Sequence, residues 1–289
     1  MKANIGILAA CLIIAASCNG SSGDDHTSSG KKGRLSIKIT APSDITFEDG
    51  DYAGIYVVSH DSNGGGGLDT NGNYIDNREF EYSSEWTTRG YIDWPKSKSK
   101  ATVYCYLPYD RLAHNSHRIE LSTKPNQSSY ANYRASCFLW GQALNLSSFE
   151  KPVNINVKHL MSRFVVKLEA GDGYTPDDLA NAKVTICKMQ TDYIVNLSEG
   201  EINGDGNECD ITPYYNDGKF YAMLIPQQIN EGRVKVTLGN TTEVLKEIIW
   251  LKSGQQYQYT LTVSKSTEGM NIDITDWTVD PIDYGGVLE

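Results

Sequence analysis

Three histidines have side chains that could act as metal ligands or as a general base. His114 and His117 have a metal-like spacing in "HNSH", but they lie in a polar loop with no Cys or carboxylate beside them. His159 opens "HLMSRFVVKL" without an obvious nucleophile or carboxylate pair to work with. We therefore expect a solvated loop at the first two histidines and a structural role for His159, with no catalytic residues.

Two Asp- and Asn-rich loops could supply oxygen ligands for calcium. The first, "DTNGNYID", covers residues 69–76, and the second, "NGDGNECD", covers residues 203–210. Both depart from the EF-hand pattern, because Tyr74 occupies the position of the turn glycine in the first loop and the second lacks the distal Glu. Asx-rich turns are the expected structure, and we predict neither a metal nor another cofactor.

Cys18 is the residue with the clearest predicted chemistry. The first 18 residues, "MKANIGILAACLIIAASC", combine one Lys with an apolar stretch that is too short to span a bilayer. Small residues stand directly before Cys18, as in a bacterial lipoprotein signal, in which the thiol is acylated and becomes the mature N-terminus. Two or more acyl chains would anchor the protein stably to a membrane.

The remaining cysteines leave a disulfide open as one of two interpretations. Cys105, Cys137 and Cys187 lie in strand-like runs, where each could be a small buried hydrophobic residue. An oxidising envelope would also permit disulfides, among which Cys187 to Cys209 would close a loop of moderate length.

The elements that must position these residues are strands. Apolar residues alternate with polar ones in many short runs, which are separated by turns rich in Gly, Asn, Asp and Pro. A single stretch, residues 175–182, resembles a helical turn, with Thr175 as its N-cap. The runs are "LSIKIT" (35–40), "ATVYCYLPY" (101–109), "VNINV" (153–157), "FVVKL" (164–168), "RVKVTL" (233–238) and "YQYTLTV" (257–263).

This spacing predicts an all-β protein with two tandem β-sandwich domains. We assign residues 1–18 to the signal peptide, 19–33 to a flexible tether, 34–152 to an N-terminal β-sandwich and 153–289 to a C-terminal β-sandwich. The net charge of −10, without a basic patch, argues against a nucleic acid partner.

Several motifs together resemble the fimbrillin-like (Mfa-like) proteins of Bacteroidetes. No one motif is specific, but all follow in the family's order behind the lipoprotein signal. They are "FEDGDYAGIYVV" (47–58), "ATVYCYLPYD" (101–110), "KPNQSSY" (124–130), "SCFLWGQAL" (136–144), "HLMSRFVVKL" (159–168), "LIPQQI" (224–229), "LKSGQQYQYTLTV" (251–263) and "IDITDW" (272–277).

The resemblance implies two sandwiches of transthyretin-like topology in a lipid-anchored surface protein, a structural or adhesive subunit of a fimbria, and no enzyme. It also implies assembly with other fimbrial subunits by β-strand addition. Asp24 and Asp25 resemble the acidic tag that sends Bacteroidetes lipoproteins to the outer face of the outer membrane.

The family's maturation protease cuts after a basic residue and removes the first strand. Here the basic residues near that strand's start are Lys31, Lys32 and Arg34, and after Lys38 none follows until Arg78. Cleavage after Arg34 would release the tether and leave "LSIKIT" attached. This departure favours an anchor, tip or stand-alone adhesin over a stalk pilin.

The alternative function is a surface carbohydrate-binding lipoprotein that contacts host or bacterial glycans. Its basis is the Tyr and Trp residues of "EYSSEW" (81–86) and "YIDW" (91–94), because aromatic rings stack on sugars. Whether these rings line an exposed shelf or pack inside distinguishes the two functions.

Overall fold

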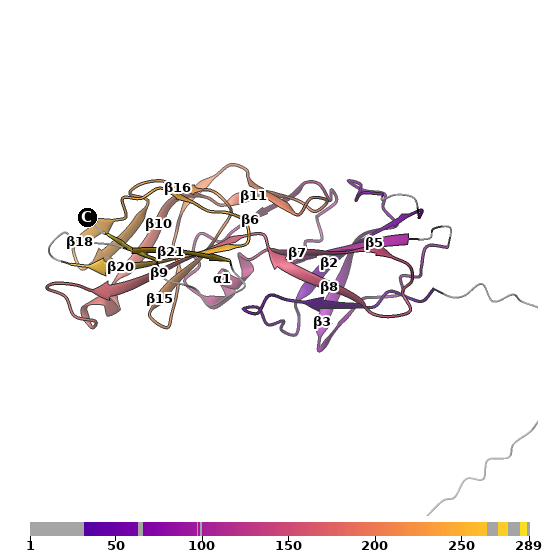
Figure 1. The fold of residues 1–289 in the computed structure, drawn as a ribbon, viewed down its shortest axis with the longest axis horizontal. Helices are drawn as coiled ribbons and strands as arrows, with labels where there is room; N and C mark the ends of the chain where they lie inside the picture. Colours follow the sequence, from indigo (N-terminus) through magenta and orange to yellow (C-terminus); the bar gives the residue numbers. More distant parts are fainter. Residues whose placement is uncertain are drawn as a thin grey trace, which may run out of the picture. The chain divides into compact units, whose positions relative to one another are not determined.

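The structure is a computed structural model, and it describes residues 32–62, 66–96, 98 and 100–264, together with the backbone of 271–276 and 284–287. Its described part is nearly all β, as the alternating sequence pattern predicts (Figure 1). Within these residues no helix is long and apolar enough to cross a membrane. The signal peptide and Cys18 lie outside the described residues.

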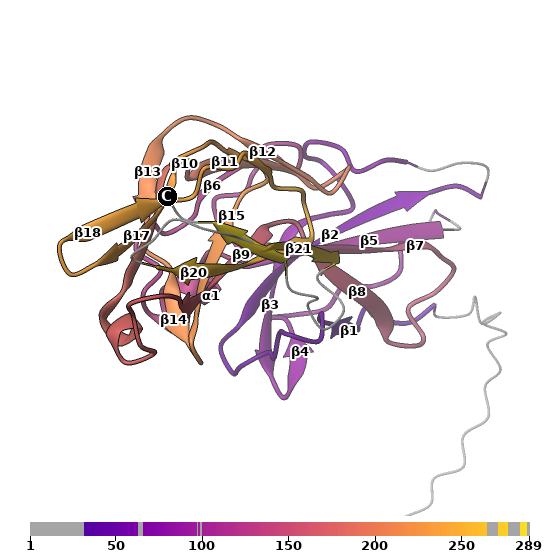
Figure 2. The same ribbon diagram turned by 60° about the vertical axis from the view of Figure 1, so that its left-hand side comes forward.

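The first large element is a seven-stranded sheet in which β1 and β4 are the edge strands. Strand β1 pairs with β8 in parallel, whereas the other pairs of this sheet are antiparallel. The two edges approach each other (Figure 2). In spatial order the strands are β1 (Ile37–Thr40), β8 (Val153–His159), β7 (Leu139–Leu146), β5 (Lys100–Leu107), β2 (Tyr52–His60), β3 (Ile75–Ser83) and β4 (Glu85–Thr87).

A three-stranded sheet supplies further side chains to the same hydrophobic core. Its strands, in spatial order, are β12 (Glu201–Gly204), β11 (Asp192–Asn196) and β6 (Ile119–Ser122). Ile119, Tyr193, Val195 and Ile202 from this sheet are buried in one cluster with Ile55, Val103 and Ile155 of the seven-stranded sheet. The first core is therefore enclosed by two sheets, as in a sandwich.

A second core lies between two other sheets. One has the order β13 (Glu208–Ile211), β10 (Lys183–Gln190), β17 (Val234–Leu238) and β18 (Thr241–Val244). The other has the order β14 (Tyr214–Asn216), β15 (Lys219–Leu224), β9 (Ser162–Ala170), β20 (Gln255–Val263) and β21 (Asn271–Asp276), with β22 (Tyr284–Val287) also paired to β20. A two-stranded sheet of β16 (Gln228–Ile229) and β19 (Ile249–Trp250) adds Ile229 and Ile249 to this core.

The predicted boundary at residue 152 stays a prediction, and several strand pairings cross it. Strand β8, placed by the sequence in the second sandwich, pairs with β1 and β7, and the β11–β12 hairpin pairs with β6. In both cases a sheet edge was available in the first half of the chain, and strand pairing satisfies backbone groups regardless of sequence distance. The division into two separate domains and the transthyretin-like connectivity stay predictions.

The alternating sequence pattern predicts the strands with one buried face well, and it predicts fully buried strands and short helices less well. Strand β8 alternates strictly between buried and exposed residues, whereas β5 is buried on both faces from Ala101 to Leu107. The expected helical turn at 175–182 is a short 3₁₀ helix, Asp178–Asn181. Helix α1 (Tyr130–Ala135) was not predicted from the sequence. Ser129 caps this helix by accepting a hydrogen bond from the Asn132 amide.

The described cysteines are all free, so the Cys187–Cys209 disulfide is not formed. Cys209 lies opposite Met189 in the β10–β13 register, and Cys187 is buried. The interpretation of small buried hydrophobic residues holds for Cys105, Cys137 and Cys187.

Candidate functional site

The edge strand β1 and the segments on either side of it form the candidate functional site. Ile37 and Ile39 of β1 are buried in the first core, and Leu35, just before the strand, is buried with them. Fully burying such a side chain contributes about 1.5–3 kcal/mol. The backbone of β1 is paired to β8 from Ile37 to Thr40, so the strand is held by both packing and hydrogen bonds.

Arg34, the predicted processing residue, lies where the chain passes between two other segments. The Leu35 amide donates to the Ile92 carbonyl at 2.8 Å, and the Phe149 amide donates to the Lys32 carbonyl at 2.6 Å. The Arg34 side chain is 59% exposed and pairs with Asp93 at 3.3 Å. A protease would therefore find the side chain accessible but the backbone on both sides of it engaged in hydrogen bonds.

The loop after β1, residues 41–51, is fastened at two points by arginines. At the first, the Asp44 carboxylate accepts a hydrogen bond from Arg163 Nη1 at 2.8 Å and lies 3.1 Å from His159 Nε2. Arg163 begins β9 of the second core and also donates to Gln256. This contact ties the segment that follows β1 to a strand more than a hundred residues away.

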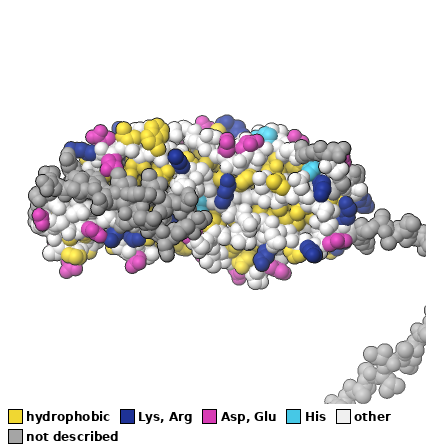
Figure 3. All heavy atoms as spheres, in the orientation of Figure 1, with side chains coloured by type: hydrophobic (Ala, Val, Ile, Leu, Met, Phe, Trp, Pro, Cys, Tyr) yellow, Lys and Arg dark blue, Asp and Glu magenta, His cyan; other side chains and the backbone are white. Residues whose placement is uncertain are grey.

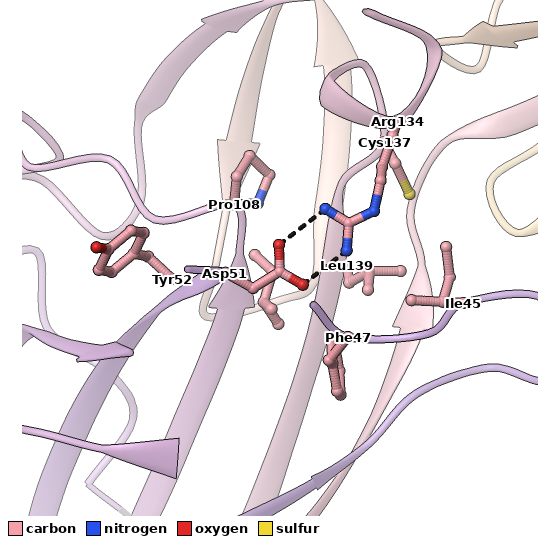
Figure 4. Close-up of a pocket in the computed structure, with 9 residues that line it drawn as sticks. Ile45, Phe47, Asp51, Tyr52, Pro108, Arg134, Cys137 and Leu139 are labelled. Atoms are coloured by element: carbon pink, nitrogen blue, oxygen red, sulfur yellow. Dashed lines mark hydrogen bonds and ion pairs between the residues drawn. The ribbon is translucent and has the colours of Figure 1, made fainter. Parts of the chain in front are cut away.

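At the second point, Asp51 and Arg134 form a two-pronged ion pair (Figure 4). Arg134 Nη1 and Nη2 donate to the two carboxylate oxygens at 2.8 and 2.6 Å, and Nη2 also donates to the Thr46 carbonyl at 3.2 Å. Burial raises the pKa of Asp51, but the hydrogen bonds from Arg134 and from the Glu48 amide outweigh burial, so the pKa lies below its usual value.

The ion pair forms one wall of a pocket under the loop (Figure 4). The pocket encloses about 430 Å³, part of which is open to solvent. Its other walls are mostly apolar and come from the loop itself, from the start of β2 and from residues at the ends of β5 and β7: Ile45, Phe47, Tyr52, Leu107, Pro108, Cys137 and Leu139.

Cys137 and Asp44 are the partners of His159 that the sequence analysis did not find. The Cys137 sulfur lies 3.3 Å from His159 Nδ1, while Nε2 faces Asp44, an order typical of a Cys–His–Asp relay. Burial, however, raises the pKa of the Cys137 thiol to about 12 and lowers the pKa of His159. Since the thiolate is the nucleophile, this buried neutral thiol is typical of a structural cysteine.

The other predicted site residues do not come together. Asp76 uses its carboxylate to accept from the Gly72 amide at 2.7 Å and from Asn73 Nδ2 at 2.7 Å, as an Asx-type turn requires. In the second loop Asp205 pairs with Arg118, and Asp210 accepts from the Lys188 amide. Among the described residues no group of three or more His, Cys, Asp or Glu could hold a metal ion.

The aromatic residues that suggested glycan binding mostly pack inside. Trp86 and Trp94 are only 7% and 6% exposed. Phe47 packs against Tyr82 and Trp86 with ring centroids 5.7 and 5.0 Å apart, which ties the loop after β1 to the opposite edge of the sheet. Tyr91 is 72% exposed, but the Arg34 guanidinium lies 3.8 Å from the centre of its ring.

Several solved structures of Bacteroides and Porphyromonas proteins share this fold. A protein of Bacteroides uniformis named as a cell adhesion protein has a TM-score of 0.64 and 18% identity, covering 85% of this chain and 99% of its own. One of Bacteroides ovatus has 0.63 and 18%, covering 87% and 98%. The tip fimbrial protein Mfa3 of Porphyromonas gingivalis, truncated at its C-terminus, has 0.50 and 8%, covering 84% and 99%.

Sequence comparison identifies the family directly. The search against curated protein sequences gives no match. The fimbrillin-like family matches residues 40–277, a range that runs from the end of β1 to just beyond β21 and includes the second hydrophobic core and most of the first. The chain therefore belongs to the fimbrillin-like family.

Proposed function

We propose that this chain is a structural and adhesive subunit of a bacterial surface fimbria. The family match over residues 40–277 supports this proposal. The observation that carries it is the β1 edge strand, which covers part of a hydrophobic core and is paired on one side to β8. Removal of such a strand would expose apolar side chains of the core and unpaired backbone groups of the neighbouring strand. A strand of another subunit could cover the side chains and pair with the backbone groups.

Assembly by β-strand addition is the corresponding mechanism, with other fimbrial subunits as partners. An incoming strand must replace Ile37 and Ile39 as well as the hydrogen bonds to β8. While β1 stays attached, it competes with any such strand at a high effective concentration. Because Arg34 precedes β1, cleavage there leaves this competitor in place, which favours an anchor, tip or stand-alone adhesin.

The proposed location is the outer face of the outer membrane, with Cys18 as the lipid-modified residue. The support is the sequence itself: small residues before Cys18, then a polar tether that carries Asp24 and Asp25. We propose a structural role without catalysis, which the match to the fimbrillin-like family supports.

A surface carbohydrate-binding lipoprotein is the second candidate function. The burial of Trp86 and Trp94 weakens its original basis. Trp250, by contrast, is 66% exposed. This exposed ring supports glycan binding as the adhesive activity of the fimbrial subunit.

Shearing the surface of the producing cells tests the main proposal. We expect the chain to be recovered with fimbriae and to be visible on them by immunogold electron microscopy. Cys18→Ala should release it from the membrane fraction, whereas the control Cys11→Ala should leave it anchored. Recovery of the chain from the periplasm, or a surface chain that never accompanies fimbriae, would contradict the proposal.

A further inference from the structure

Trp250 is an unusually exposed tryptophan. Its exposed fraction is 66%, whereas Trp86, Trp94 and Trp140 are each exposed by 7% or less. Within the described part of the chain, its ring makes no aromatic or cation–π contact. An exposed indole is a large apolar surface with one hydrogen-bond donor, a combination enriched in binding sites.

The β16–β19 pair explains why Trp250 faces outward. In this antiparallel pair, Ile229 lies opposite Ile249, and both are buried in the second core. Gln228 lies opposite Trp250. Since successive side chains of a strand point to opposite faces, Gln228 and Trp250 share the outer face. Ile248, next to the strand, is 57% exposed, and hydrophobic side chains gather at the surface in the region of β16 (Figure 3).

Among the described residues, the side-chain amides of Gln228 and Asn230 keep hydrogen-bonding groups without a protein partner. Gln228 Nε2 donates to Asn230 Oδ1 at 2.8 Å. This bond leaves the Gln228 carbonyl oxygen as an acceptor and the Asn230 NH₂ group as a donor. A hydroxyl group both donates and accepts, so adjacent hydroxyls of a sugar match this pair.

We propose that the surface formed by Trp250, Gln228 and Asn230 is a binding site for a neutral glycan, in which a sugar ring stacks on the indole and its hydroxyls bond to the two amides. The net charge of −10 disfavours anionic glycans. This inference rests on the proposed adhesive function, because it supplies the ligand class for that function.

Tyr91 provides a matched control. It is another exposed aromatic residue, at 72%, but Arg34 already covers one face of its ring at 3.8 Å. Its neighbour Ile92 accepts a hydrogen bond from the Leu35 amide and is buried in the first core, whereas the β16–β19 pair belongs to the second core.

The experiment uses the full chain in a detergent without a sugar headgroup. A glycan array with neutral and anionic oligosaccharides identifies binders, and titration calorimetry measures the Kd of the strongest neutral one. We expect Trp250→Ala to weaken binding at least about tenfold and the double variant Gln228→Ala, Asn230→Ala to weaken it by a comparable factor. Tyr91→Ala should leave the Kd unchanged within about twofold.

Three outcomes would overturn the inference: no neutral glycan binds, the tightest binders are anionic, or Tyr91→Ala and Trp250→Ala lose the same affinity. Self-association that Trp250→Ala abolishes would also overturn it, by making this surface a contact between copies. Because fimbrial recovery is measured separately, a Trp250→Ala chain that still accompanies fimbriae leaves the proposed function intact even if no glycan binds.

Discussion

The Asp51–Arg134 ion pair is one of the two contacts with an arginine that hold the loop after β1. Its side chains are only 17% and 25% exposed, so solvent screens them weakly. Arg134→Ala would leave the Asp51 carboxylate and the Thr46 carbonyl without these donors. We expect this variant to lower the free energy of unfolding by about 2 kcal/mol, measured by urea denaturation.

Arg118→Ala is the control for that prediction. Arg118 also contacts two carboxylates, those of Glu120 and Asp205, but its side chain is 52% exposed. Exposed pairs contribute less than about 1 kcal/mol. Equal losses for the two variants would show that the Asp51–Arg134 pair is no stronger than a surface contact.

His159 makes the stability depend on pH. Burial lowers the pKa of His159 from its usual 6.5, against the opposing effect of Asp44. The unfolded chain therefore binds a proton at a higher pH than the folded chain does, and stability falls as the pH drops below about 6.5. Denaturation at several pH values between about 7 and 5 should show this fall, and His159→Gln should reduce its slope. An unchanged slope in the variant would exclude His159 as its cause.

Among the strands, β1 is the one on which the proposed assembly by strand addition depends. Trypsin treatment of the native chain should trim the tether at the basic residues before β1 and leave β1 in place, because Lys38 belongs to a strand paired with β8 and Leu35, Ile37 and Ile39 are buried. Mass spectrometry of the product should show a monomer that begins no later than Leu35.

Ile39→Ala tests the reason for this protection. Removing a buried isoleucine costs about 2–5 kcal/mol, so β1 should open more often and trypsin should then reach Lys38. Ser36→Ala, an exposed neighbour, should leave the cleavage pattern unchanged. If trypsin removes β1 from the wild-type chain and oligomers form, the chain is a polymerising stalk subunit instead.

In the whole molecule, strand β15 contributes to both cores, since Met223 is buried in the first core and Ala222 and Leu224 are buried in the second. We therefore expect the two cores to unfold together. The Gln127 side chain is fully buried and bonds to both the amide and the carbonyl of Met223 at 2.8 Å. Leu160 and Met161, between β8 and β9, are also fully buried. This burial argues against the proteolytic cut that a linker near residues 150–158 would allow.

We therefore expect calorimetry of a chain that spans residues 32–289 to show one cooperative transition. Gln127→Ala leaves two backbone groups of Met223 unsatisfied and should lower the Tm by several degrees, consistent with a loss of about 2 kcal/mol. Gln228→Ala, on the outer surface, should not. Two well-separated transitions in the wild-type chain would instead support two independent sandwiches.

The fold class and the family could both be predicted from the amino-acid sequence. Alternating apolar residues identified β1, β8, β9 and β20, because the period of two is a local property of a strand with one buried face. The ordered motifs from residue 47 to residue 277 identified the fimbrillin-like family. The signal at Cys18 is likewise local, which is why it is readable in the sequence, although its acylation stays a prediction.

Which side chains come into contact depends on the tertiary structure and could not be predicted from the sequence. Asp44, Cys137 and His159 come together from three separate segments, and nothing in the local sequence of any one of them specifies the other two. The parallel pairing of β1 with β8, and the exposure of Trp250 in contrast to Trp86 and Trp94, depend in the same way on long-range packing. The alternating pattern shows which face of a strand is apolar, but the neighbouring strands determine what covers that face.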